Sequence, residues 1–318
     1  MFIETEFWEQ HSLANHLHSL LLFFVMLMFL SLLDWLLLGS DGIFLLLLPG
    51  LILLVFNPVA SPWLIMRLYR ATLLPLHQAP QINMALNELA HRSGLEKVPK
   101  LFYIPSSMIN AFTVGSRNEA AIAVSDGLLK ALTHRELVGV LAHEVSHIRN
   151  NDMLVMSIAD LISRLTSLLS LFGQFLLLLN LPLILLTNVS INWFAIFLLV
   201  FAPNLSSLAQ LGLSRVREYN ADLGAARLTA DPRGLASALV KIGQYSGSFF
   251  EKIMMPGRRI PVPSLLRTHP LTEDRVQRLM ALDPATIPPS EPHDLSYNIN
   301  SRDVVNHKPR WHINGLWH

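Results

Sequence analysis

The chain has 318 residues, of which 52% are hydrophobic and 15% are charged, and its mean hydropathy is +0.41. This composition is too apolar for an ordinary soluble domain and indicates a membrane protein. The formal net charge of +1 gives no general attraction to nucleic acid, and the sequence contains no glycine loop that would cradle a phosphate. Because cysteine is absent, a metal would have to be bound by histidine and carboxylate side chains.

A first membrane hairpin is expected over residues 19–66. Residues 1–18 are acidic and carry histidines, so we expect a polar N-terminal tail that is disordered or lies at the membrane interface. Residues 19–38 are apolar apart from Asp34 and are long enough to span a bilayer. Residues 43–66 carry no charge and predict a second span, with a glycine-rich turn between the two.

The first part of a soluble domain is expected over residues 67–160. Apolar spacing predicts a helix over residues 82–91 that ends at Gly94. Three runs with strand composition predict a small sheet, namely residues 100–104, 111–114 and 120–124. The edge of such a sheet is a natural place for an extended peptide to add as a further strand.

A second helix in this region carries a His-Glu-x-x-His motif. The helix begins at a capping box of Thr133 and Glu136, and it then presents His143, Glu144 and His147 within a largely apolar run. Histidines four residues apart lie on one face of a helix and can bind one zinc ion. Zinc lowers the pKa of a bound water to about 7, and a neighbouring glutamate can act as general base. The alternative is a pair of polar histidines on the exposed face of an amphipathic helix, with an ordinary solvated glutamate between them.

A second membrane hairpin is expected over residues 161–214. Residues 165–214 contain no charged side chain, which is too long for one span and suits two. The turn between them is expected at residues 187–190, with residues 180–182 as the rival position. All 24 lysines and arginines lie outside residues 1–66 and 165–214, so the positive-inside rule places the domain on the cytoplasmic side of a multi-pass membrane protein.

A second polar and largely helical part follows over residues 215–280, and residues 281–318 are expected to form a proline-rich tail. Glu218 and Asp222 are one helical turn apart directly after the fourth span. Glu218 can supply the third zinc ligand, and Asp222 can accept the free ring N–H of a zinc-bound histidine. From spacing alone, a surface helix with ordinary charge pairs remains an equal alternative.

The order of these motifs resembles the HtpX-like membrane zinc metalloproteases, part of a gluzincin group that includes the CAAX prenyl endopeptidases. His143-Glu144-x-x-His147, two apolar spans and Glu218-x-x-Ala221-Asp222 follow one another as in that family. Further similar elements are Asn110-Ala111-Phe112 with Gly115, the run from Ser125 to Leu129, and Thr268-His269-Pro270 with Arg275 in the helix after it. Thr113-Val114 stands where smaller residues are common in the family.

The resemblance implies an integral membrane protein, mainly α with a small β-sheet, in which about four transmembrane helices accompany a gluzincin-like zinc metalloprotease domain. It implies one zinc ion per chain, held by His143, His147 and Glu218, with Glu144 as base. It also implies that residues 110–112 align substrate and that His269 stabilises the oxyanion, although a histidine before proline is more often a loop cap. Expected substrates are membrane or misfolded proteins, in quality control under stress.

Two other classes of function are alternatives. A catalytically silent membrane scaffold or chaperone could keep the same fold, but its metal and base residues would be expected to have degenerated, and His143, Glu144, His147 and Glu218 have not. A small metal transporter would require polar or charged pairs deep within the spans, and only Asp34 comes close.

Overall fold

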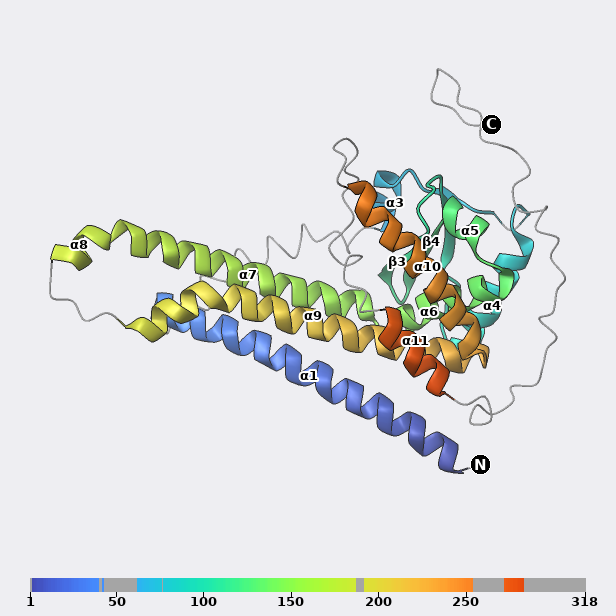
Figure 1. Ribbon diagram of the computed structural model, residues 1–318, viewed down its shortest axis with the longest axis horizontal. Coiled ribbons are helices and arrows are strands. Elements are labelled where there is room, and N and C mark those ends of the chain that lie inside the picture. The colour runs from blue at the N-terminus through green and yellow to red at the C-terminus, as the bar shows by residue number, and fades with distance from the viewer. Residues whose placement is uncertain are drawn as a thin grey trace, which may run out of the picture.

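In the computed structural model, three long helices extend from a compact domain of helices around a small sheet (Figure 1). The structure describes residues 2–39, 42, 62–75, 77–186, 192–253 and 272–282. The compact domain holds all four strands and the helix that carries the His-Glu-x-x-His motif.

The sheet has the strand order β1-β2-β4-β3, with β1 (Thr72–Leu73), β2 (Lys100–Ile104), β3 (Ala111–Ser116) and β4 (Glu119–Ser125). β2 and β4 run parallel, whereas β3 pairs antiparallel with β4 through a tight connection at Arg117 and Asn118. These strands confirm the three predicted ones. β3 lies at one edge of the sheet, where an additional strand could pair.

Helices pack on both faces of this sheet. The domain contains α3 (Pro62–Leu68), α4 (Pro80–Ser93), α5 (Asp126–Ala131), α6 (His134–Arg149), α10 (Pro232–Ile253) and α11 (Thr272–Ala281). α4 confirms the helix predicted over residues 82–91. It ends at Gly94, whose φ of 72° is a left-handed conformation that suits glycine.

Alternation along β4 gives each face of the sheet its own core. Ile122 and Val124 pack with Leu141 and Val145 of α6 in the main core, which also includes residues of α4, α9 and α10. The intervening Ala121 and Ala123 face the opposite side, where a smaller core forms with Ile65 and Met66 of α3. The sheet therefore holds α6 against its inner face.

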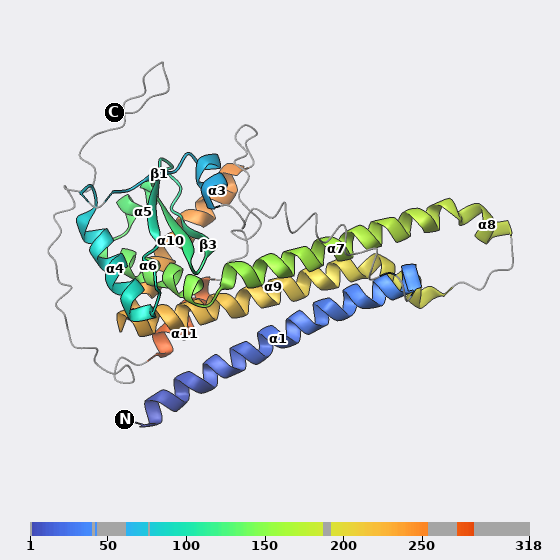
Figure 2. The same cartoon turned by 180° about the vertical axis from the view of Figure 1, so that it is seen from behind.

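The long helices α1 (Phe2–Leu38), α7 (Asp152–Leu179) and α9 (Trp193–Thr229) lie side by side, as Figure 1 and the reverse view in Figure 2 show. Each contains a stretch that is long and apolar enough to cross a membrane, beginning at Leu13 in α1. Large apolar side chains such as Phe24, Leu171 and Leu208 are more than 60% exposed on these helices, as expected for surfaces that face lipid. A membrane protein with a mainly helical fold and a small sheet is thus confirmed.

The first predicted hairpin differs from the structure at its N-terminal end and is only partly described. Residues 2–18, expected as a polar tail, form the first part of α1, because no proline or glycine interrupts the chain before Gly39. The span predicted over residues 43–66 lies outside the described residues up to residue 61, and its last residues belong to α3.

The helix that carries the third predicted span begins before residue 161. α7 starts at Asp152, and Asp160 and Arg164 form an i, i+4 ion pair of 2.7 Å within it. α7 ends at Leu179 with Asn180 as its C-cap, and the short helix α8 (Leu181–Leu186) follows. The favoured turn at residues 187–190 lies outside the described residues, so its position stays a prediction.

Candidate metal centre

The metal-binding motif lies on α6, which is almost completely buried. The predicted capping box is present, because Thr133 Oγ1 accepts from the Glu136 amide and the Glu136 carboxylate accepts from the Thr133 amide. This fixes the start of the helix between the sheet and the later helices. Two turns further on, His143 is 4% exposed and His147 is partly buried, with their ring centroids 4.6 Å apart. The exposed-face alternative is therefore wrong for these two histidines.

α9 brings Glu218 to the same point. His143 Nε2 lies 3.0 Å from His147 Nε2 and 3.3 Å from Glu218 Oε2, and His147 Nε2 lies 3.7 Å from Glu218 Oε1. One ligand atom from each of these residues lies within 4.8 Å of the others. Ligand atoms about 2.0–2.2 Å from a tetrahedral zinc are separated by roughly 3.3–3.6 Å, so this donor set fits such an ion.

The outer nitrogen of each histidine contacts a carboxylate. His143 Nδ1 lies 3.0 Å from Asp222 Oδ1, and His147 Nδ1 lies 2.6 Å from Asp152 Oδ2. Each Nε2 is therefore left to face the other ligand atoms. Arg275 in turn donates to both oxygens of Asp222 at 2.6 and 2.7 Å and lies 3.0 Å from Glu218 Oε2.

The carboxylates make this cluster a place that favours positive charge. Burial disfavours the charged form of His143, but hydrogen bonds to Asp222 and Glu218 outweigh it and raise its pKa to about 10. The pKa of His147 is also raised, because Asp152 and Glu218 outweigh burial and the repulsion from His143. The same charge balance suits a bound divalent cation.

Glu144 lies beside the ligand cluster and points toward the sheet. Thr113 of the edge strand β3 donates a hydrogen bond of 2.7 Å from Oγ1 to Glu144 Oε2. Glu144 is 7% exposed, so the hydroxyl contacts a carboxylate that is largely removed from water. One oxygen of Glu144 is thereby held in place from the strand at which substrate is expected to pair.

The predicted substrate strand lies next to this glutamate. The Ser125 amide donates to the Asn110 carbonyl at 3.0 Å, which makes these two residues a hydrogen-bonded pair of the β3–β4 ladder. Since hydrogen-bonded and non-hydrogen-bonded pairs alternate along the strands, Phe112 also pairs toward β4, and Ala111 and Thr113 present their main-chain groups to the open edge. The Phe112 side chain is only 3% exposed and belongs to the smaller core.

His269, the residue proposed for the oxyanion, lies outside the described residues. Its role stays a prediction. The residues that follow it are described from Thr272 onward, where α11 begins and carries Arg275 to the metal cluster.

With this geometry in place, comparison with known proteins decides the family. Residues 76–283 match the family described as peptidase family M48. The chain belongs to peptidase family M48.

Several relatives in the M48 family are named protease HtpX homologs. One from Acaryochloris marina is 35% identical over 239 residues, covering 68% of this chain and 76% of the relative. One from Paraburkholderia phytofirmans is 34% identical over 258 residues, covering 77% of this chain and 88% of the relative. The crystal structure of S. mikatae Ste24p is similar with a TM-score of 0.47 and 20% identity, covering 85% of this chain and 66% of that chain.

The resemblance drawn from the sequence is thereby confirmed. The chain is an HtpX-like membrane metalloprotease of the M48 family, a hydrolase, and nothing in the comparisons favours a silent scaffold.

Sequence reasoning missed two residues of this M48 centre and understated a third. Asp152 is not singled out by the sequence, yet it contacts His147. Arg217 is not singled out either, yet it binds Asp152. Arg275 was noted only through the resemblance, yet it contacts Glu218 and Asp222. The missed signal was the placement of Asp152 five residues after His147, across a helix break that can turn the chain back.

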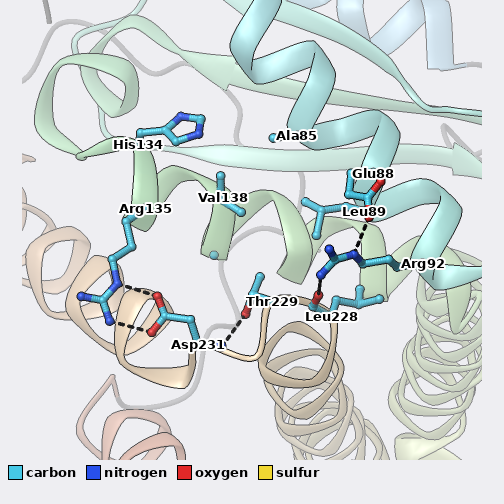
Figure 3. A pocket seen from close by; sticks show the side chains of 11 residues that line it. Ala85, Glu88, Leu89, Arg92, His134, Arg135, Val138, Leu228, Thr229 and Asp231 are labelled. Carbon is cyan, nitrogen blue, oxygen red and sulfur yellow. Dashed lines mark hydrogen bonds and ion pairs between the residues drawn. The ribbon is translucent and has the colours of Figure 1, made fainter. Parts of the chain in front are cut away.

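A separate cavity of about 390 Å³ lies on another side of α6, between α4 and the end of α9 (Figure 3). Its charged side chains are paired with groups of the protein. Arg135 binds both oxygens of Asp231 at 2.5 and 2.7 Å, and Arg92 binds Glu88 at 2.7 Å and the Leu228 carbonyl at 3.2 Å. The Arg135–Asp231 pair ties the start of α6 to the segment after α9, and Arg92 ties α4 to the end of α9.

Proposed function

We propose that this metalloprotease is a zinc-dependent endopeptidase in which His143, His147 and Glu218 hold the metal. The observation that carries the proposal is the convergence of two Nε2 atoms and one carboxylate within 4.8 Å, while both Nδ1 atoms are engaged by Asp222 and Asp152. This donor set contains only nitrogen and oxygen atoms, which suits zinc at a catalytic site with one position left for water or substrate.

Glu144 is proposed as the general base. Zinc, when bound, polarises the scissile carbonyl and makes a water molecule sufficiently acidic near neutral pH. The Glu144 carboxylate takes the proton from the attacking water and later delivers it to the leaving amine. Thr113 holds Glu144 Oε2, so that the other oxygen is free to face the water.

The edge of β3 is proposed as the substrate-binding strand. An extended peptide that pairs there would bind the main-chain groups of Ala111 and Thr113, and its backbone would lie beside Glu144. Asn110 is joined to Ser125 at the start of the strand, and Phe112 anchors it in the core. These residues would therefore place the strand, with the contacts to substrate made by its backbone. His269 keeps its proposed role as oxyanion donor.

Membrane or misfolded proteins are proposed as substrates, in quality control under stress. Two observations support this. Asp152 of α7 and Glu218 of α9 join the two histidines of α6 at the centre, and both α7 and α9 are candidate membrane spans. Residues 1–66 and 165–214 contain no lysine or arginine, so the positive charges lie in the remaining parts of the chain, which include the domain. The second observation supports a cytoplasmic domain in a protein of the inner membrane.

The test compares the wild type with Glu144→Gln, both purified in detergent with zinc, and measures bound metal and cleavage of an unfolded or membrane-protein substrate. We expect both proteins to retain metal and only the wild type to cleave. Glu119→Gln, at an exposed position on β4, serves as the matched control and should cleave like the wild type. Equal cleavage by Glu144→Gln would indicate a contaminating protease and contradict the proposed base.

A further inference from the structure

We infer that Asp152 is a positioning residue for the zinc ligand His147, and that Arg217 holds Asp152 in place. Asp152 Oδ2 lies 2.6 Å from His147 Nδ1. Its other oxygen, Oδ1, accepts from Arg217 through Nε at 2.5 Å and through a terminal guanidinium nitrogen. The inference rests on the proposed zinc centre and adds two residues to it.

The chain geometry between α6 and α7 brings this carboxylate to the histidine. α6 ends at Arg149 with Asn150 as its C-cap, and Asn151 adopts a left-handed conformation with φ of 54°. α7 then starts at once with Asp152, which turns back toward His147 on the preceding helix. Arg217 also donates to the Asn150 carbonyl at 2.8 Å, so α9 holds the connection between α6 and α7 in place.

Burial makes these contacts strong and specific. The Asp152 and Arg217 side chains are only 5% and 7% exposed, and a charge buried to this degree is costly without an opposite partner. Asp152 also lies in the first turn of α7, where the helix dipole favours a negative charge. A carboxylate held in this way keeps the His147 Nδ1 proton and leaves Nε2 directed at the other ligand atoms.

The two histidines are thus supported by the same kind of arrangement. His143 contacts Asp222, which binds Arg275 from α11. His147 contacts Asp152, which binds Arg217 from α9. The second arrangement differs because its carboxylate belongs to the first turn of a candidate membrane span.

A purely structural role for the same ion pair predicts something different. An Asp152–Arg217 pair that only tied α7 to α9 would affect stability and leave the metal geometry unchanged. A positioning role predicts a change in zinc affinity and in the ligand field of the bound metal, because the His147 ring would lose its fixed orientation.

The experiment uses the full-length protein in detergent and the variant Asp152→Asn. Zinc affinity is measured by competition with a chromophoric chelator, and the visible spectrum of the cobalt-substituted protein reports the ligand geometry. We expect zinc affinity to fall about 10- to 100-fold and the cobalt spectrum to change. Asp160→Asn is the matched control on the same helix, because Asp160 forms its ion pair of 2.7 Å with the exposed side chain of Arg164. This control should match the wild type in zinc affinity and in the cobalt spectrum.

Asp152→Asn leaves the buried Arg217 without its carboxylate and could prevent folding. The double variant Asp152→Asn/Arg217→Gln removes both charges, so no unpaired buried charge remains. Its zinc affinity and cobalt spectrum can then be measured on folded protein. Weaker zinc binding and an altered cobalt spectrum in the folded double variant would support the inference. Wild-type affinity and spectrum in either folded variant would overturn it while leaving the zinc centre intact, whereas a wild type that bound no zinc would overturn both.

Discussion

Thr113 Oγ1 on the edge strand lies 2.7 Å from Glu144 Oε2 on α6, so the proposed substrate strand and the proposed general base are directly hydrogen-bonded. Hydrogen bonds to charged groups contribute about 1.5–3 kcal/mol. We expect Thr113→Val, which keeps the shape and removes the donor, to lower kcat about 10-fold with little change in KM, because the carboxylate loses its fixed orientation. Steady-state kinetics on a peptide substrate measure this.

Thr113→Ser is the control for this variant, because it keeps the hydroxyl and should restore most of kcat. If Thr113→Val kept the kcat of the wild type, the hydroxyl would have no part in orienting Glu144. A rise in KM with unchanged kcat would instead indicate a role in substrate pairing alone.

Gly224 of α9 lies against Ser146 of α6. A Cβ at this position would lie 2.6 Å from Ser146 Oγ and 3.0 Å from Ser146 Cβ, and Ser146 is fully enclosed beside His147. We expect Gly224→Ala to destabilise the protein by about 1–3 kcal/mol and to weaken zinc binding, because α9 must move away from α6 and carry Glu218 with it. Thermal unfolding in detergent and chelator competition measure the two effects.

Two comparisons sharpen this test. Gly212 lies on the same helix, and a Cβ at this position would meet only the flexible end of the Leu22 side chain at 3.3 Å. Gly212→Ala should therefore destabilise the protein less than Gly224→Ala. Adding Ser146→Ala to Gly224→Ala removes the shorter of the two contacts and should recover part of the loss. An unchanged unfolding temperature and zinc affinity for Gly224→Ala would show that the helices tolerate the added methyl group.

The lowered pKa of Glu136 should make the stability of the protein fall in acid. Burial raises its pKa, but hydrogen bonds from Lys241, Ser237 and Thr133 outweigh burial and lower the pKa to about 2. A carboxyl group whose pKa is lower in the folded protein contributes stability that is complete above its unfolded pKa and is lost as the pH falls toward the folded value. The contribution is on the order of 3 kcal/mol and should disappear between about pH 4.5 and pH 2.

The measurement is the unfolding temperature of the wild type and of Glu136→Gln across this pH range. The variant should be less stable near neutral pH, and the difference should shrink as the pH falls. Glu88→Gln, whose carboxylate is 42% exposed in a surface pair with Arg92, should differ little from the wild type at any pH. A constant gap between wild type and Glu136→Gln would mean that packing, and not charge, determines the effect.

Arg275 neutralises carboxylates at the metal centre, where it is 3% exposed. We expect Arg275→Met to cost about 3–5 kcal/mol of stability in the metal-free protein, because Asp222 and Glu218 lose their buried counter-ion. The cost should be smaller in the zinc-loaded protein, since the metal supplies positive charge at the same place. Arg278→Met is the matched control on α11, because Arg278 is exposed and stacks 3.8 Å from the Tyr219 ring. Equal destabilisation with and without zinc would contradict this charge balance.

Local sequence signals predicted the parts of the centre that lie on one element. The capping box of Thr133 and Glu136, the spacing of His143 and His147, and the pair of Glu218 and Asp222 depend on positions one helical turn apart. The strands followed from runs with strand composition, and the edge position of β3 agrees with the expected place for a peptide. The choice of Glu218 over a surface role needed the family resemblance, since spacing left both alternatives open.

Contacts between distant parts of the chain could not be predicted from such signals. Arg217 and Asp152 are 65 residues apart, and Thr113 and Glu144 are 31 residues apart. Such pairs depend on the angle at which α7 leaves α6 and on the register of β3, which local composition does not determine. The extension of α1 through residues 2–18 was missed for another reason, because polarity was given more weight than the absence of helix-breaking residues.

The continuity of α9 has a mechanical consequence. One helix runs from Trp193 to Thr229, and after Pro203 it contains no further proline before it reaches Glu218. At 1.5 Å per residue, Glu218 stands roughly 22 Å along the axis from Pro203, so a tilt of about 5° at the proline would move it by roughly 2 Å. Lipids of different acyl-chain length, which change the tilt of a span, would therefore act on the spacing between Glu218 and the two histidines.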